Sequence, residues 1–152
     1  GKMVTFIPHL MGFELTYNDG AAFSLFGNLP EVPRRILLIS FSTIGAIVMI
    51  VVLAMKYKKL NWWYKSSLYL MLAGCVGNFI DRVFYEKGLV IDFIRFIFWE
   101  KFAIFNLADV FLVVGAFLLI IAVVIEEIQD NFKMKKIDKD IEESKDDEKA
   151  DR

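Results

Sequence analysis

The sequence predicts an all-α membrane protein, a bundle of three transmembrane helices with a small extracytoplasmic β-like platform. The chain has 152 residues, of which 57% are hydrophobic and 15% aromatic. A small water-soluble domain could not hide that much apolar surface, so a membrane protein is the first expectation. Three long apolar runs, separated by polar or charged segments, provide the spans.

Residues 1–31 are expected to be an extracytoplasmic segment that lies on the membrane surface. Proline, glycine and polar residues interrupt each apolar run well before the ~20 residues that a membrane-spanning helix needs. Residues 13–17 (FELTY) alternate and are rich in aromatic side chains, as a short strand is. The Asn18-Asp19-Gly20 sequence that follows is a turn signal. The segment lacks the basic and apolar regions of a signal peptide.

Residues 32–125 are expected to form the membrane bundle. Pro33 begins the first span, at the position where a missing N–H costs least. From Ile36 to Met55 this span has 20 uncharged residues, about the thickness of one bilayer core. An aromatic belt of Trp and Tyr marks the start of the second span. The three expected spans cover residues 33–55, 61–83 and 106–125.

Two further segments complete the predicted organisation. Residues 84–104 link the second and third spans, and within this link residues 89–99 are apolar. Periodicity leaves open whether 89–99 is a strand or a helix that lies in the membrane interface. Residues 126–152 are dense in Lys, Asp and Glu. They are expected to form a charged cytoplasmic tail, in which a short helical continuation gives way to a solvated, mobile end.

The orientation follows from the number of spans and from the distribution of cations. Three spans put the loop at 57–61 and the C-terminal tail on one side, and residues 1–31 and the 84–104 link on the other. The first side carries lysine clusters and is therefore expected to be cytoplasmic. The clustered lysines are Lys56, Lys58, Lys59, Lys133, Lys135 and Lys136, whereas the other side has Arg34, Arg35, Lys87, Arg95 and Lys101. Asp81, Asp92 and Asp109 then all lie at the outer interface.

These acids are the candidate functional residues, since ionisable groups at membrane depth are costly and functional by default. Gly74, Gly77, Asn78 and Asp81 share one helical face by their spacing, and Arg82 borders it. Two carboxylates held close together share a proton. One member can then activate water while the other protonates a leaving amine. This is the chemistry of an aspartic protease, and it needs neither a metal nor a cofactor.

Each feature also has a structural alternative. Asn106 and Asp109 fit a helix N-cap with an acid in the first turn, and Asp92 could be a loop acid paired with Arg95. The remaining alternatives are an interfacial charge cluster at Asp81, Arg82 and Glu86, helix packing at Gly74 and Gly77, and a buried structural role for Cys75.

Three functions are therefore compatible with the residues: a membrane aspartic peptidase, a non-catalytic membrane scaffold and a proton-linked carrier. A carrier needs acids near the membrane midplane, whereas these acids stand at the ends of the expected helices. The net charge of −1 argues against a nucleic-acid partner.

Four motifs in the sequence resemble those of lipoprotein signal peptidase (signal peptidase II), a family of bacterial aspartic peptidases. They occur in the family's order, and the resemblance covers roughly residues 5–125. The matching stretches are Asn18-Asp19-Gly20-Ala21-Ala22-Phe23 (N-x-G-A-A-F), Gly74–Arg82 (G-x-x-G-N-x-x-D-R), Val90-Ile91-Asp92-Phe93 (V-x-D-F) and Phe105-Asn106-Leu107-Ala108-Asp109 (F-N-x-A-D).

The resemblance implies site roles that the residues alone leave open, including the choice of Asp92 over Asp81 as the partner of Asp109. Asp92 and Asp109 would be the catalytic pair, and Asp81 a structural acid beside them. The residues that line or support the site would be Asn18, Gly20, Asn78, Arg82, Asn106 and Ala108. The family has four spans, and by the resemblance this chain corresponds to the family without its first transmembrane helix.

The resemblance also implies a substrate and a location. The substrate would be a prolipoprotein whose lipobox cysteine already carries diacylglycerol, and the enzyme would cut just before that cysteine. Inhibitors of the globomycin type are expected to occupy the same groove. The protein is expected to be a monomer among the lipids of the bacterial inner membrane, with its active site facing the extracytoplasmic side and with no metal or cofactor.

Overall fold

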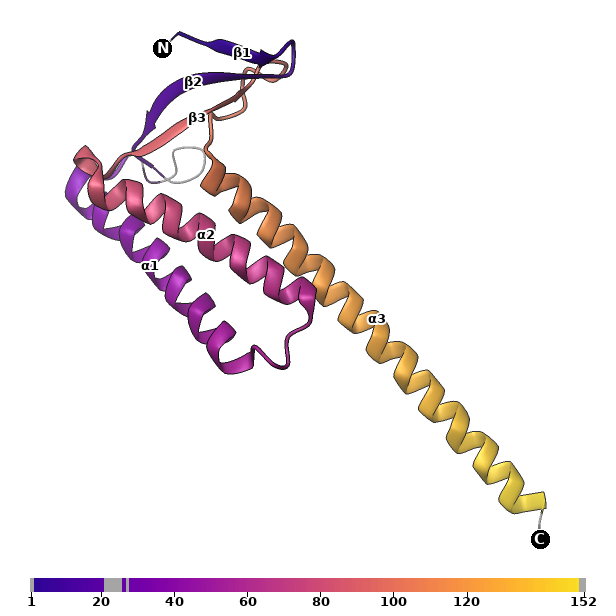
Figure 1. Ribbon diagram of the computed structural model, residues 1–152. Coiled ribbons are helices and arrows are strands. Elements are labelled where there is room, and N and C mark those ends of the chain that lie inside the picture. The colour runs from indigo at the N-terminus through magenta and orange to yellow at the C-terminus, as the bar shows by residue number, and fades with distance from the viewer. Residues whose placement is uncertain (1, 21–25, 27, 151–152) are drawn as a thin grey trace.

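In the part of the chain that it describes, the computed structural model contains three long helices and one three-stranded sheet (Figure 1). It describes residues 2–20, 26 and 28–150, with side chains described up to residue 138. In chain order the elements are β1 (Val4–Ile7), β2 (Met11–Asn18), α1 (Glu31–Lys56), α2 (Trp62–Phe84), the short helix η2 (Glu86–Gly88), β3 (Val90–Phe96) and α3 (Leu107–Ala150). The sheet stands at the end of the bundle where α1 begins, α2 ends and α3 begins (Figure 1).

The three predicted spans are confirmed. Among the described residues, three helices are long and apolar enough to cross a membrane. Their surfaces expose large apolar side chains such as Phe41 and Phe117, at 60% and 63%, as lipid-facing helices do. Helix α1 starts two residues before the predicted Pro33. The first helical bond runs from the Arg34 N–H to the Pro30 carbonyl at 3.1 Å, so Pro33 still occupies the first turn, where an N–H has no partner.

Helix α2 lies at the centre of the bundle and packs against both α1 and α3. Small residues allow α2 and α3 to approach closely. A Cβ atom on Gly74 would lie 2.5 Å from the Ala108 carbonyl oxygen, and one on Gly77 would lie 2.9 Å from the Ala108 Cβ. Further along, the Ser67 hydroxyl donates to the Gly115 carbonyl at 2.8 Å. Helix packing therefore accounts for both glycines of the second motif.

The sheet has the order β1-β2-β3 and is antiparallel throughout. Strand β2 contains the predicted strand at residues 13–17. Strand β3 decides the question that periodicity left open, since residues 90–96 are a strand and do not form an interfacial helix. The register between β2 and β3 shifts once, between Phe13 and Thr16, and beyond that shift Thr16 stands opposite Asp92.

A tight turn at η2 returns the chain from α2 to β3. Lys87 and Gly88 both have positive φ, at 55° and 71°. A Cβ atom on Gly88 would lie 2.6 Å from the Arg35 Cγ, so the turn is pressed against the start of α1 and needs glycine there. Because the turn is short, β3 begins close to the end of α2 and packs against that helix.

The tail differs from the prediction. A short helical continuation and then a mobile end were expected, whereas α3 is helical to Ala150. Figure 1 shows this part of α3 projecting beyond α1 and α2. The tail contains many Lys and Glu residues, which are good helix formers, and an ion pair one turn apart joins Asp130 to Lys133 at 3.1 Å. The helix propensity of these residues therefore outweighs their high charge density, from which a mobile end was predicted.

Candidate active site

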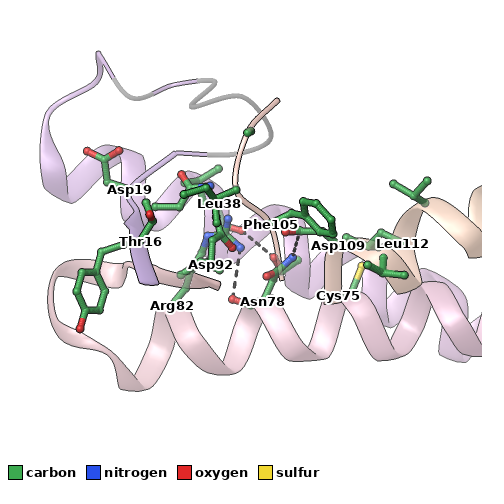
Figure 2. A pocket seen from close by; sticks show the side chains of 18 of the residues that line it. Thr16, Asp19, Leu38, Cys75, Asn78, Arg82, Asp92, Phe105, Asp109 and Leu112 are labelled. Carbon is green, nitrogen blue, oxygen red and sulfur yellow. Dashed lines mark hydrogen bonds between the residues drawn. The ribbon is translucent and has the colours of Figure 1, made fainter. Parts of the chain in front are cut away.

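An open groove of about 970 Å³ lies at the end of the bundle beside the sheet. Its lining includes five of the predicted site residues, from four different elements: Asn18, Asn78, Arg82, Asp92 and Asp109. Figure 2 shows Asn78, Asp92 and Asp109 gathered near one end of α2, and one of the hydrogen bonds in this cluster joins Asn78 to Asp109. These polar residues, predicted to converge, therefore do meet at one end of the bundle.

Asp92 is the more deeply buried of the two carboxylates. It is 1% exposed, on β3. One carboxylate oxygen accepts a hydrogen bond from the Asn18 amide at 2.9 Å, and the other accepts one from the Asn106 amide at 2.8 Å. A carboxyl group buried to this degree needs such donors, because an unpaired one would destabilise the fold.

Asp109 stands in the first turn of α3 and forms a reciprocal cap with Asn106. The Asn106 side-chain oxygen accepts from the Asp109 N–H at 3.0 Å, and the Asp109 carboxylate accepts from the Asn106 N–H at 3.1 Å. This is a capping box, in which two otherwise unpaired N–H groups are satisfied. The N-cap alternative is therefore correct, and it coexists with the placement of both residues in the groove.

Two asparagine amides connect the carboxylates. The Asn106 amide donates both to Asp92 and to the Asn78 side-chain oxygen, the latter at 3.1 Å. The Asn78 amide in turn donates to Asp109 at 3.0 Å. Asp92 and Asp109 are therefore the ends of one hydrogen-bonded chain, which fixes the position of each relative to the other. Among the described residues, no three His, Cys, Asp or Glu side chains cluster as metal ligands would.

The turn after β2 completes the site. The Gly20 N–H donates to the Asn18 side-chain oxygen at 2.9 Å, which forms an Asx turn and leaves the Asn18 amide directed at Asp92. The Gly20 carbonyl accepts from Arg82 at 3.2 Å, and Arg82 also donates to the Asn78 carbonyl at 3.3 Å. Arg82 thus ties the turn to α2.

The surroundings of Asp92 favour its protonated form. Burial is the largest cause and raises its pKa, and the nearby Asp109 carboxylate raises it further. The hydrogen bonds from Asn18 and Asn106 and the positive charge of Arg82 act in the opposite direction. The balance raises the pKa of Asp92 from 3.8 to about 6. A carboxyl group that keeps its proton to higher pH than an ordinary aspartate, beside a second carboxylate, can act as an acid.

Asp81 and Ala108 have structural positions. Asp81 accepts a hydrogen bond from the Ile91 N–H at 3.1 Å, so it anchors the start of β3 one residue before Asp92. Its carboxylate is not part of the chain of hydrogen bonds that joins Asp92 to Asp109. Ala108 packs against Gly74 and Gly77. The residues Ala21–Phe23 of the first motif lie outside the described residues.

One alternative from the sequence is wrong. Asp92 does not pair with Arg95, because the Arg95 guanidinium forms an ion pair with Glu14 of β2. The two residues stand three positions apart in a strand, where side chains on opposite faces of the sheet diverge. The alternative treated Asp92 as a loop acid, whereas residues 90–96 form a strand.

The sequence did not indicate the apolar walls of the groove. Leu38, Phe41 and Ser42 of α1 form one wall, and α3 contributes Val110 and Leu112–Val114. The aromatic residues Phe96, Phe102 and Phe105 close the end near the sheet. Cys75 was expected to be buried, but it is half-buried and also lines the groove. In a membrane protein an apolar residue fits lipid, a helix neighbour or a groove equally well, so no sequence signal separates them.

The three apolar helices define the class, a multi-pass membrane protein, whose groove holds two carboxyl groups, one from β3 and one from α3. A family model described as Signal peptidase (SPase) II matches residues 1–125. The chain therefore belongs to the signal peptidase II family and is a peptidase of that family, as its motifs predicted.

Individual relatives agree with this assignment. The lipoprotein signal peptidase of Streptococcus pneumoniae is 35% identical over 131 residues, which are 86% of this chain and 80% of that protein. The lipoprotein signal peptidase of Enterococcus faecalis is 37% identical over 127 residues, or 84% and 73%. A bacterial membrane enzyme whose structure was solved by the in meso method superposes with a TM-score of 0.72 at 33% identity, covering 84% of this chain and 73% of that one.

Proposed function

We propose that this protein removes the signal peptide from prolipoproteins, cutting just before a lipobox cysteine that carries diacylglycerol, with Asp92 and Asp109 as the catalytic pair. The observation that carries the proposal is the hydrogen-bonded chain from Asp92 through Asn106 and Asn78 to Asp109, at the end of an apolar groove. Two carboxyl groups held in this way can perform acid and base steps on one peptide bond.

The surroundings of the two acids assign their roles. Asp92 is buried and its pKa is raised to about 6, so we assign it the shared proton. Asp109 accepts hydrogen bonds from Asn78 and from the Asn106 N–H. It also stands in the first turn of α3, where a negative charge interacts favourably with the helix dipole. We therefore assign Asp109 the role of the base.

The reaction then proceeds in two stages. Asp109 takes a proton from a water molecule, whose oxygen attacks the scissile carbonyl carbon, while Asp92 gives its proton to the carbonyl oxygen. The resulting tetrahedral intermediate collapses as its hydroxyl returns a proton to Asp92 and Asp109 protonates the departing cysteine nitrogen. The bond between carbon and nitrogen breaks, and both acids regain their starting states.

The walls of the groove suit such a substrate. Apolar side chains from α1 and α3 flank the carboxylates, and acyl chains and the apolar core of a signal peptide gain free energy by burial there. A globomycin-type inhibitor is expected to compete for this groove. Both acids and both bridging amides come from one chain, so we propose a monomer as the active unit.

The location follows from the positions of the lysines. Lys56, Lys58 and Lys59 stand at the end of α1 away from the sheet, and Lys133, Lys135 and Lys136 follow the span of α3. Lysines mark the cytoplasmic side of a membrane protein. We therefore propose that the active site faces the extracytoplasmic side of the bacterial cell membrane.

The direct test is cleavage of a synthetic lipobox peptide by the full chain in detergent. The diacylglyceryl-modified peptide should be cut, and mass spectrometry should find the modified cysteine at the new N-terminus. The same peptide with an unmodified cysteine is the control and should be cut much more slowly. Equal cleavage of both peptides would contradict the proposed substrate, and the absence of cleavage by a folded chain would contradict the proposed activity.

The pH dependence of cleavage should report the titration of Asp92. The reaction needs this carboxyl group protonated, and its pKa is about 6. Above that value kcat/KM should fall about tenfold for each pH unit, because only the protonated fraction is active. The measurement is kcat/KM over about two pH units on either side of that value. A rate that stays constant from pH 6 to pH 8 would show that Asp92 is not the acid.

A further inference from the structure

An ion pair between Glu14 of β2 and Arg95 of β3 joins the two strands beside the site. The two side chains are 19% and 28% exposed, so the pair is largely shielded from water. Neither residue belongs to the motifs that led to the family, and neither lines the groove. The pair lies where the register between β2 and β3 changes, and its role is inferred from that position.

Glu14 lies within the irregularity of the sheet. Between Phe13 and Thr16, β2 advances three residues while its partner β3 advances only two, from Ile94 to Asp92. One extra residue on β2 therefore decides which residues stand opposite Asp92. A shift by a single residue would turn every following side chain of β2 to the other face of the sheet. Asn18 would then no longer reach Asp92.

The Arg95 end of the pair adjoins the segment that holds Asn106. Ile94, the residue before Arg95, exchanges hydrogen bonds with Phe105, with the Phe105 N–H donating at 3.0 Å and its carbonyl accepting at 2.8 Å. Phe105 immediately precedes Asn106, the second amide that donates to Asp92. The ion pair therefore stands between the two segments that supply both hydrogen-bond donors of Asp92.

We propose that the Glu14–Arg95 ion pair is a positioning device for the catalytic pair, which fixes the register of β2 against β3 so that Asn18 and Asn106 both reach Asp92. Its effect on cleavage rests on the proposed function, because it acts through the position of Asp92 in the catalytic pair. The ion pair contacts neither the substrate nor the reacting atoms. It stabilises the strand register in which Asp92 keeps its hydrogen bonds from Asn18 and Asn106.

The titration of Asp92 can detect this role. Among the described residues, the charged groups that act on Asp92 are Asp109 of α3 and Arg82 of α2. Neither belongs to the ion pair, so loss of the pair changes Asp92 chiefly through the movement of its amide donors. Because the Asn18 and Asn106 hydrogen bonds lower the pKa of Asp92, loosening them should make Asp92 hold its proton to higher pH.

The test compares Arg95→Met with the charge-exchanged pair Glu14→Arg and Arg95→Glu in the full chain. The Asp92 titration is followed by NMR of ¹³C-labelled aspartate, assigned as the signal that is lost in Asp92→Asn. Arg95→Met should raise the midpoint by about half to one pH unit. Measured below both midpoints, where Asp92 is protonated in both proteins, its kcat/KM should be about tenfold lower because Asp92 is misplaced. The charge-exchanged protein should return both toward wild type. If Arg95→Met does not fold, Arg95→Gln, which can still donate one hydrogen bond, should give a smaller shift in the same direction.

Lys133→Met provides the matched control, since it breaks an exposed ion pair with Asp130 far from the site and should leave the Asp92 midpoint unchanged. A lower unfolding temperature with an unchanged midpoint in Arg95→Met would overturn the proposal and leave the pair a purely structural role. Failure of the charge exchange to restore the midpoint would also overturn it. If wild type does not cleave the lipidated peptide, the proposed function fails, and the titration still decides whether the pair positions Asp92.

Discussion

Asp92→Asn and Asp109→Asn should each nearly abolish signal-peptide cleavage, lowering kcat/KM by about 10²- to 10⁴-fold, the usual contribution of a positioned acid or base. An asparagine has nearly the same shape as an aspartate but cannot exchange a proton with water or substrate. Since the two carboxyl groups act on one peptide bond, the double variant should be scarcely slower than either single one.

The measurement is initial rate on the diacylglyceryl lipobox peptide, with thermal unfolding in detergent recorded for each variant. Asp130→Asn is the matched control, because Asp130 lies on the exposed part of α3 and should have no effect on the rate. Asp81→Asn should retain measurable activity, since Asp81 binds the Ile91 N–H and is not joined to Asp109. Full activity in Asp92→Asn or Asp109→Asn would exclude the proposed pair.

The membrane spans were predictable because their signal is local. An uncharged run of about 20 residues has few alternatives to crossing a bilayer, and Ile36–Met55 is such a run. Strand β3 was not predictable in this way. Apart from Asp92 and Arg95 its residues are apolar on both faces, so they fit a strand and an interfacial helix equally well. Its conformation is set by pairing with β2, and the Asn18–Asp92 hydrogen bond spans 74 positions of the sequence.

The sequence predicted where the candidate site lies, but it only partly predicted which residues carry out the chemistry. Counting spans brought Asp81, Asp92 and Asp109 to one interface, but it could not select the pair. The structure distinguishes the two acids by their hydrogen-bond donors. Asp81 accepts a hydrogen bond from the backbone N–H of Ile91, whereas Asp92 accepts hydrogen bonds from side-chain amides. The sequence also presented the N-cap and the site as alternatives for Asn106, whereas one side chain serves both.

Asn106→Ala should therefore have two separable effects. The substitution removes the cap that Asn106 forms on the Asp109 N–H, which should lower the free energy of unfolding by about 0.5–2 kcal/mol. It also removes the donor to the buried Asp92 and to Asn78. Both carboxyl groups then lose their fixed separation, and kcat/KM should fall about 10²-fold, as expected for a misplacement of about 1 Å.

Asn106→Ser distinguishes these effects. Serine is an efficient N-cap, so most of the stability should return, but its single short hydroxyl cannot bridge Asp92 and Asn78. Asn61→Ala is the converse control, since Asn61 caps α2 through the Tyr64 N–H at 3.1 Å. This variant should lose stability and keep its rate. If Asn106→Ser recovered stability and activity together, the bridge between the carboxylates would be dispensable, and Asn106 would act only by starting α3.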